Sequence, residues 1–404
     1  MKQRTQVCIA GGGPAGMMLG VLLARAGVAV TVLEKHADFL RDFRGDTIHP
    51  STLQIMDELG WLEEFLTLPH QKVRQLFGQF GQTRLQMADF SHLPVKAPYI
   101  AMMPQWDLLN FLARKGRSYP SFELKMQTEA VDLIMGDGRV VGVKSETGGT
   151  TTDVFADLVV AADGRGSLLR DRAGLVPQEF GAPMDVLWFR LPRLAGDTDE
   201  TQGRFDAGLV FVMLNRGDYW QCAYVIPKGG DATVRAAGLA AFQASVAKIL
   251  PVDASRAKAI TDWDQVKLLT VKVDRLLEWA RPGLLCIGDA AHAMSPVGGV
   301  GVNLAVQDAV ATANALTWPL LMGTLTFDDL KRVQARRDRP TRATQRLQLL
   351  MQNTVISHSL SAKGTITPPL LLRVLLALPF VSRIPARLIG LGFRPEHVEA
   401  VEAR

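Results

Sequence analysis

Two glycine-rich segments, far apart in the chain, carry residue types that bind phosphates and sugar hydroxyls. The first, residues 11–16, reads GGGPAG and contains the G-x-G-x-x-G pattern. The second begins at Gly288 and Asp289 and ends with PVGGVGVN at residues 296–303. Glycines permit a close approach of the backbone to a ligand, and a carboxylate accepts hydrogen bonds from hydroxyl groups. Two such segments predict one long dinucleotide cofactor that is held at both ends.

The elements around the first segment are those that a dinucleotide site requires. Residues 6–10 are predicted to form a buried strand, residues 17–26 a helix, and residues 28–33 a second strand that ends on Glu34. In this order a pyrophosphate rests on the helix N terminus, and the carboxylate accepts hydrogen bonds from an adenosine ribose. The predicted cofactor contacts here are Gly11, Gly13, Pro14, Ala15, Gly16, Glu34 and Lys35.

A third motif lies between the two segments and completes a resemblance. Residues 157–167 read DLVVAADGRGS and are centred on Asp163 and Gly164. Together the three motifs make the chain resemble the flavin-dependent monooxygenases of the para-hydroxybenzoate hydroxylase type, over roughly residues 5–310. The resemblance implies that Asp163 lies at the FAD and pyridine-nucleotide sites and that Asp289 binds the flavin ribityl chain.

The resemblance also implies contacts outside the three motifs. Arg44 occupies the flavin-contacting arginine position of the family, Gln105 occupies another FAD-contacting polar position, and Ala130 is a candidate backbone contact on the adenine side. The chain departs from its relatives at Val300, where they often carry glutamine. That departure puts a side-chain contact at this position in doubt.

The residues after Asp289 also have a physical reason to lie against a flavin. An apolar helix is predicted from about Val302 to Leu316. The positive end of its dipole would stabilise negative charge on the reduced flavin near N1 and O2. The predicted cofactor contacts in this region are Asp163, Asp289, Gly299, Gly301, Val302 and Asn303.

Few residues stand out as candidates for catalysis. Asp46 and His49 lie on the Arg44 loop, which in the family runs along the active site, so both could steer a substrate hydroxyl. Pro296 is predicted to face the flavin and to shape the substrate side. His292 belongs to the third motif, and we expect it to have a structural role. No metal site is expected.

The order of these elements predicts an α/β protein. It has an FAD-binding Rossmann-like domain of the GR2 type, an interleaved antiparallel-sheet substrate domain and a C-terminal helical region. The expected boundaries are FAD-binding parts at 1–75, 106–180 and 276–345, substrate-domain parts at 76–105 and 181–275, and the helical region at 346–404.

The substrate domain is predicted from strand-like segments in the middle of the chain. They span residues 184–191, 209–214, 219–226 and 268–273. An antiparallel sheet packed on one face would line a pocket over the flavin with the other face. The candidate lining residues, each of which could instead belong to the core or the surface, are Trp188, Arg190, Met213, Trp220 and Tyr224.

The composition excludes several other classes of protein. The chain has 404 residues, of which 48% are hydrophobic and 21% charged, as in a globular protein with a large core. The net charge of +5 derives largely from residues 331–346, which favour a solvated helix face over nucleic-acid binding. The three cysteines form no CxxC pair, so we expect buried thiols in a reducing, cytoplasmic compartment.

The C-terminal region allows several interpretations. Residues 368–379 read PPLLLRVLLALP, which is apolar and flanked by arginines. Such a segment could lie on a membrane surface, over the substrate entrance or at a subunit contact. We favour packing within the protein, and both a monomer and a homodimer remain open.

The resemblance implies a function. We expect an FAD-dependent monooxygenase that hydroxylates an aromatic or other apolar ring substrate, with NADPH or NADH as transient reductant and O2, through a C4a-hydroperoxyflavin. The alternatives are an FAD-dependent reductase of isoprenoid-type double bonds and a non-catalytic flavin-binding protein. The chain lacks the second G-x-G-x-x-G and the CxxC of disulfide reductases, and the WxWxIP segment of flavin-dependent halogenases.

Overall fold

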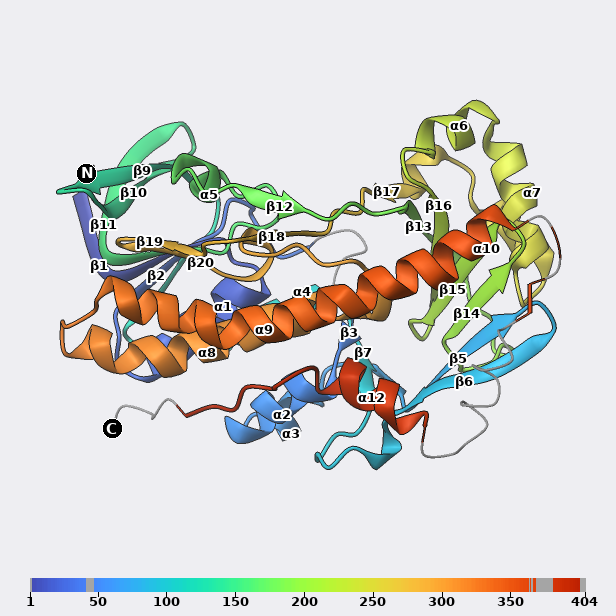
Figure 1. The fold of residues 1–404 in the computed structure, drawn as a ribbon, viewed down its shortest axis with the longest axis horizontal. Helices are drawn as coiled ribbons and strands as arrows, with labels where there is room; N and C mark the ends of the chain where they lie inside the picture. The colour runs from blue at the N-terminus through green and yellow to red at the C-terminus, as the bar shows by residue number, and fades with distance from the viewer. Residues whose placement is uncertain (1, 41–46, 363, 365, 368–380, 400–404) are drawn as a thin grey trace.

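The computed structural model describes residues 2–40, 47–362, 364, 366–367 and 381–399, and it contains two large sheets joined by long helices (Figure 1). The first sheet has eight strands. Its core is parallel, and Val7, Cys8 and Ile9 at its centre are completely buried, as expected where helices cover both faces. Its strands, in spatial order, are β19 (Ala280–Arg281), β20 (Leu284–Cys286), β11 (Thr150–Ala161), β1 (Lys2–Ala10), β2 (Val30–Leu33) and β8 (Phe122–Lys125), with β9 (Thr128–Gly136) and β10 (Arg139–Thr147) added at β11.

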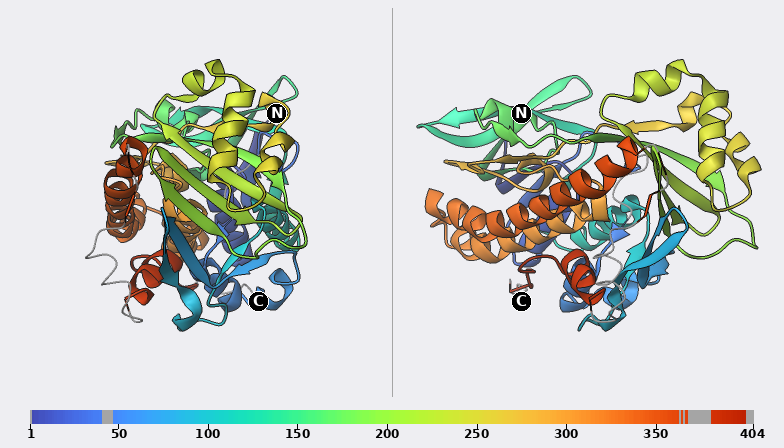
Figure 2. Two further views of the ribbon diagram at one scale, coloured as in Figure 1. Left: turned by 90° about the vertical axis from the view of Figure 1, so that its right-hand side faces the viewer. Right: turned by 45° about the vertical axis from the view of Figure 1, so that its right-hand side comes forward.

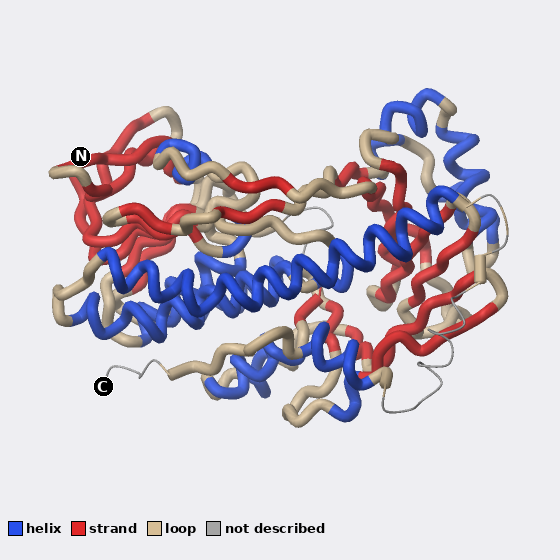
Figure 3. Tube along the Cα trace, in the orientation of Figure 1, coloured by secondary structure: helices blue, strands red, loops and turns tan. Residues whose placement is uncertain are grey.

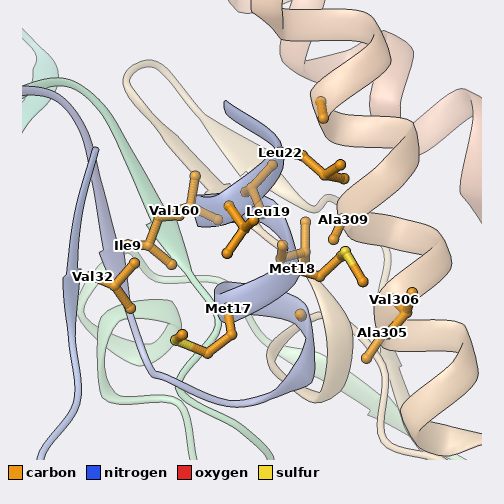
Figure 4. Close-up of a cluster of buried hydrophobic side chains, with 14 of the residues drawn as sticks. Ile9, Met17, Met18, Leu19, Leu22, Val32, Val160, Ala305, Val306 and Ala309 are labelled. Atoms are coloured by element: carbon orange, nitrogen blue, oxygen red, sulfur yellow. The ribbon is translucent and has the colours of Figure 1, made fainter. Parts of the chain in front are cut away.

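Helices pack tightly on this sheet because small residues line their contacts. α1 (Pro14–Arg25) is buried from Ala15 to Ala24 and lies between the sheet and α8 (Gly301–Leu321). Figure 4 shows side chains of α1 between those of the strands and the small alanines of α8. The labelled residues are Met17, Met18, Leu19 and Leu22 of α1, Ile9, Val32 and Val160 of the strands, and Ala305, Val306 and Ala309 of α8.

The second sheet has seven strands and carries most of the predicted substrate domain. The strands predicted at 184–191, 209–214 and 219–226 are present as β13, β15 and β16. Helix α7 (Leu239–Ile249) covers one face of this sheet. In spatial order the strands are β17 (Lys267–Leu269), β13 (Met184–Pro192), β16 (Tyr219–Pro227), β15 (Leu209–Asn215), β14 (Gln202–Asp206), β5 (Gln75–Phe80) and β6 (Thr83–Asp89).

One strand prediction was wrong in length. The strand expected at 268–273 is the short β17, which ends at Leu269. Beyond it, the Val271 N–H donates to the carboxylate of Asp185 at 2.9 Å. A side chain therefore replaces a neighbouring strand as the hydrogen-bond partner, and the chain leaves the sheet for β18 (Asp274–Leu276), which pairs with β12 (Pro177–Glu179).

A small third sheet and several short helices complete the described fold. Its strands are β3 (Thr47–Ile48), β7 (Ile100–Met102) and β4 (Gln71–Val73). The shorter helices are α2 (Pro50–Glu58), α3 (Leu62–Phe65), α4 (Gln105–Gly116), α5 (Leu168–Arg172), α6 (Asp231–Ala236), α10 (Ser357–Ser361) and α12 (Arg383–Gly390).

Helix α9 (Phe327–Met351) connects the two halves of the molecule. It runs beside α8 and continues towards the seven-stranded sheet, as Figures 2 and 3 show. A π-helical turn (Gln352–Ile356) and then α10 follow it. The boundary expected between residues 345 and 346 therefore falls inside one continuous helix. No helix in the described parts of the chain has the length and apolar character needed to cross a membrane. Residues 368–379, the apolar segment discussed above, lie outside the described residues.

Candidate functional site

The three sequence motifs follow three adjacent parallel strands and meet at one edge of the eight-stranded sheet. β1 leads into Gly11, β11 into Asp163, and β20 into Gly288. Backbone hydrogen bonds hold the loops together, because the N–H of Ala162 donates to Ala10 and that of Ile287 to Ala161. The carboxyl edge of a parallel sheet is where such folds bind dinucleotides.

Two glycines of the first loop are required by close packing. Gly11 has φ of +106°, and a Cβ there would lie 2.3 Å from the carbonyl oxygen of Ala162. A Cβ on Gly16 would lie 2.0 Å from the carbonyl oxygen of Gly11. Gly13 differs, since a Cβ there would meet nothing within 4 Å. Gly11 and Gly16 are therefore required by the fold, whereas Gly13 faces open space.

The N terminus of α1 presents backbone donors towards that space. Gly13 is its N-cap residue and Pro14 opens the helix, with no side-chain cap among the described residues. The first N–H groups of a helix have no partner within the helix. Glu34 lies beside the loop, where its carboxylate accepts from the N–H groups of Gly12 at 2.9 Å and His36 at 3.0 Å.

The second and third motifs are joined by an ion pair. Arg165 Nε donates to the carboxylate of Asp289 at 3.0 Å, and both side chains are about one-third exposed. Asp163 lies deeper. Its Oδ2 accepts from the Leu169 N–H, and its Oδ1 is buried with no partner among the described residues. Burial raises the pKa of the Asp163 carboxyl.

A buried aspartate fixes the start of the third motif. Asp308 accepts from the Gly288 N–H at 3.1 Å and from His292 Nε2 at 2.6 Å through Oδ2, and from Arg337 Nε at 2.9 Å through Oδ1. Burial opposes its charge, but His292 and Arg337 together hold the pKa of Asp308 below its usual value. The imidazole of His292 also packs on Trp279, with ring centroids 5.0 Å apart. These contacts agree with the structural role expected for His292.

Asn303 connects the third motif to the segment at residues 47–52. Its side-chain oxygen accepts from the His49 N–H at 2.8 Å and the Thr52 hydroxyl at 2.7 Å. Its side-chain nitrogen donates to the carbonyls of Thr47 and Gly299. The predicted cofactor contact of Asn303 is therefore left to its backbone, because its amide side chain is fully used within the protein.

The beginning of α8 presents a second set of backbone donors. The Leu304 N–H donates to the Val300 carbonyl at 2.9 Å. The N–H groups of Gly301, Val302 and Asn303 thus precede the first intrahelical bond. A Cβ on Gly301 would meet nothing within 4 Å.

The predicted catalytic residues have different locations. Pro296 opens a tight turn in which the Gly299 N–H donates back to the Pro296 carbonyl at 3.0 Å. His49 is completely buried, and its Nδ1–H donates to the Ile389 carbonyl in α12 at 2.7 Å. Burial lowers the pKa of the imidazole to about 4. The contact with α12 indicates that His49 anchors the C-terminal region. Arg44 and Asp46 lie outside the described residues.

The remaining predicted cofactor contacts lie on elements other than the three motif loops. Gln105 is the first residue of α4, and Ala130 pairs with Ser145 in β9 and β10. Lys35 is exposed and lies 3.4 Å from Glu129. These contacts within the protein do not by themselves indicate a ligand site at Gln105, Ala130 or Lys35.

Three of the candidate pocket-lining residues belong to the core, on the α7 side of the seven-stranded sheet. Met213, Trp220 and Tyr224 belong to the buried cluster that packs against α7. Side chains alternate along a strand, so the opposite face carries Trp188 with Val186, Val210, Val212, Ala223 and Val225. Val297, from the turn after Pro296, packs against this cluster. Arg190 is exposed and stacks on Tyr219.

The sequence interpretation also missed three buried glutamines, on α9 and the π-helical turn after it, that bind the segment before and after Pro296. They are Gln345, Gln348 and Gln352. Their spacing places them on one helix face, and this regularity was the signal that could have identified them.

Comparison with known proteins gives consistent results. A family model described as "FAD binding domain" matches residues 4–346. The 6-methylpretetramide 4-monooxygenase of Streptomyces rimosus is 33% identical over 358 residues, covering 87% of this chain and 85% of that protein. The para-nitrophenol 4-monooxygenase of Pseudomonas sp. strain WBC-3 is 25% identical over 328 residues, 77% of each chain. The solved structure of the p-nitrophenol 4-monooxygenase of Pseudomonas putida DLL-E4 matches with a TM-score of 0.75 at 20% identity, covering 96% of this chain and 97% of that one.

Proposed function

This chain belongs to the FAD binding domain family and is an FAD-dependent monooxygenase, and from that premise we propose that it hydroxylates an aromatic ring with NADPH or NADH and O2. The observation that carries the proposal is the meeting of three motif loops at one sheet edge, after β1, β11 and β20. When bound, FAD supplies hydride acceptance and oxygen activation, and the protein supplies position and electrostatics.

The adenine end of FAD would bind along β1 and β2. The uncapped N terminus of α1 suits a pyrophosphate, because its free N–H groups and helix dipole favour an anion. Open space at Gly13 leaves room for that group. Glu34 lies beside the same loop, within reach of a ribose hydroxyl.

The flavin end would bind between the third motif and α8. Asp289 is partly exposed and would accept from the ribityl chain while it keeps its contact with Arg165. The unpaired helical donors at Gly301 and Val302 would stabilise negative charge on the ring. The buried orphan oxygen of Asp163 is a further acceptor at this edge.

The substrate ring would bind beside the Pro296 turn, next to the seven-stranded sheet. The sheet face against which Val297 packs consists of Met184, valines, Ala223 and Trp188. Such a surface excludes water and binds apolar rings. Two relatives are named for p-nitrophenol and 6-methylpretetramide, and we extend ring hydroxylation to this chain on that basis.

Turnover measurements test the proposal and separate it from the two alternatives. Purified protein with FAD is given NADPH or NADH and a panel of phenols that begins with p-nitrophenol. Hydroxylation requires substrate-stimulated oxidation of the nucleotide, matching oxygen uptake and a product that gains one oxygen atom. Nucleotide oxidation without oxygen uptake would support the reductase, and no oxidation with any substrate would support a binding protein.

A substitution tests the flavin end of the site separately. Asp289→Asn removes the negative charge that pairs with Arg165 and that would accept hydrogen bonds from the ribityl chain. A hydrogen bond to a charged group contributes about 1.5 kcal/mol or more, so the Kd for FAD should rise about tenfold. Fluorescence titration of the apoprotein with FAD measures it. Asp157→Asn is the control, because Asp157 pairs with Arg4 at the same kind of distance, 2.9 Å, outside the loops. An unchanged Kd for Asp289→Asn would contradict the assignment.

A further inference from the structure

Three glutamines form a buried ladder along one face of α9 and its π-helical extension. Gln345, Gln348 and Gln352 are 1%, 3% and 0% exposed. Their spacing of three and four residues places them on the same side of the helix. A buried amide is costly unless its hydrogen bonds are satisfied, so a row of three requires a specific partner.

The partner of the ladder is the backbone on either side of Pro296. Gln348 accepts from the Ser295 N–H at 3.2 Å and donates to the carbonyls of Ser295 at 2.9 Å and Val297 at 2.8 Å. Gln352 donates to the Ser295 hydroxyl at 2.6 Å, and that hydroxyl accepts from the Val297 N–H at 3.2 Å. Side chains of α9 therefore bind both residues that flank the proline.

Gln345 extends the ladder to the start of the same segment. Its side-chain nitrogen donates to the carbonyls of Ala293 at 3.1 Å and Asp274 at 2.7 Å, and its oxygen accepts from Arg275 at 2.6 Å. The turn that follows, Val297–Gly299, is a short 3-10 turn with left-handed glycines at Gly298 and Gly299, and the Thr47 hydroxyl donates to the Gly299 carbonyl at its far end at 2.8 Å. The start of this turn is thus bound from outside, by α9.

The same end of α9 also contacts the seven-stranded sheet. Ile356 of the π-helical turn and Leu360 of α10 pack in the cluster that contains Val186 and Val210. The Gly208 N–H, in the turn between β14 and β15, donates to the Ser359 carbonyl at 2.9 Å. Figure 1 shows α10 beside β15. One continuous helical segment therefore binds both the Pro296 turn and the seven-stranded sheet.

We propose that the glutamine ladder is a positioning device that sets the position of the Pro296 turn relative to the seven-stranded sheet, with Gln348 as its central positioning residue. The proposal rests on the proposed function, in which the substrate ring and the flavin bind beside this turn. If the turn shifts, substrate and flavin are no longer aligned. Reducing equivalents are then lost to hydrogen peroxide, as NAD(P)H and a proton reduce O2 to H2O2 without hydroxylation.

The test replaces Gln348 by leucine and compares it with a matched change in the same helix. Gln348→Leu keeps the approximate size but removes three hydrogen bonds to Ser295 and Val297. Gln334→Leu is the control, because Gln334 also accepts from and donates to backbone, at Trp279 and Leu277, away from the turn. Both variants should lose some thermal stability, so stability alone cannot decide.

Two measurements decide the outcome. With substrate present, Gln348→Leu should raise the fraction of NAD(P)H that appears as hydrogen peroxide several-fold and raise KM, whereas Gln334→Leu should leave both unchanged. Without turnover, visible circular dichroism of bound FAD should change in Gln348→Leu only, and this readout stands even if the wild type hydroxylates none of the substrates. If Gln348→Leu fails to fold, Gln352→Leu, which loses one bond, replaces it. Equal behaviour of the two helix variants in both measurements would overturn the proposal.

Discussion

Individual buried polar residues in this protein bind backbone groups of distant segments. The amide of Asn303 binds residues 47–52, and the carboxylate of Asp308 binds Gly288. The imidazole of His49, in the 47–52 segment, donates in turn to the backbone carbonyl of Ile389 in α12. Such bonds fix the loops more firmly than apolar contacts, because an unpaired buried polar group is costly. The candidate site is therefore held by residues that do not face it.

At this scale, replacing His49 should change the acid sensitivity of the protein. Burial lowers the pKa of the imidazole from 6.5 to about 4. Between these values the unfolded chain binds a proton that the folded protein does not, so the stability of the wild type falls as pH falls through this range. The shift corresponds to about 3 kcal/mol at its limit. His49→Asn keeps a donor for Ile389 but does not titrate. Its urea unfolding free energy should fall less between pH 6.5 and 4, and parallel pH profiles for both proteins would contradict this.

The elements of the eight-stranded sheet bring the motifs together because parallel strands end at a common edge. β1, β11 and β20 are neighbours, and the loop after each carries one motif. The register of β1 with β11 pairs Ala10 with Ala161, so the two loops begin at the same level. Close packing of Gly11 against Ala162 follows directly from that register.

Two glycine substitutions in one loop should therefore have different effects. Gly11→Ala places a Cβ against the Ala162 carbonyl at a left-handed φ and should lower the unfolding free energy by about 3 kcal/mol or prevent folding. Gly13→Ala meets no protein atom and has an extended backbone, so it should fold normally but bind FAD more weakly. Chemical unfolding and FAD titration measure the two effects. A stable Gly11→Ala protein, or unchanged FAD affinity in Gly13→Ala, would disagree with this division of roles.

Over the whole molecule, the C-terminal segment returns to the first half of the chain. Glu396 is buried and accepts from Arg336 at 2.8 Å and from Arg337 at 3.3 Å. His397 and the Val398 N–H both donate to Glu58 at the end of α2. Through Arg337 and Asp308 this contact continues to Gly288, so one chain of buried charges links the C-terminal segment to the third motif.

Breaking that link should destabilise the protein more than breaking a surface ion pair. Glu396→Gln leaves Arg336 and Arg337 without their buried carboxylate and should lower the unfolding free energy by about 3 kcal/mol. The comparison is Glu200→Gln, whose exposed partner is Arg84 and whose cost should stay below about 1 kcal/mol. Urea unfolding of both variants is the measurement. A similar small cost for both would show that the C-terminal link contributes little.

Much of the fold, and the three loops of the candidate site, could be predicted from local sequence. Each of the three motifs predicts the turn in which it lies, because glycine and buried-strand patterns are local properties of the sequence. The strands at β13, β15 and β16 were likewise predicted from their apolar runs. The sequence did not predict which face of those strands α7 covers. Side chains alternate between the two faces, but Trp188 on one face and Trp220 on the other are both apolar.

The sequence by itself determined the family, the cofactor and the order of the motifs, because these depend on residues that are neighbours in the chain. Only the tertiary structure decided which side chains remain for a ligand. The side chain of Asn303 is hydrogen-bonded to residues 47–52, and Asp289 forms an ion pair with Arg165. It also decided that α9 holds the Pro296 turn through Gln348, a contact across 53 residues. Hydrogen bonds between distant segments depend on how helices and sheets pack in space, which no local pattern specifies.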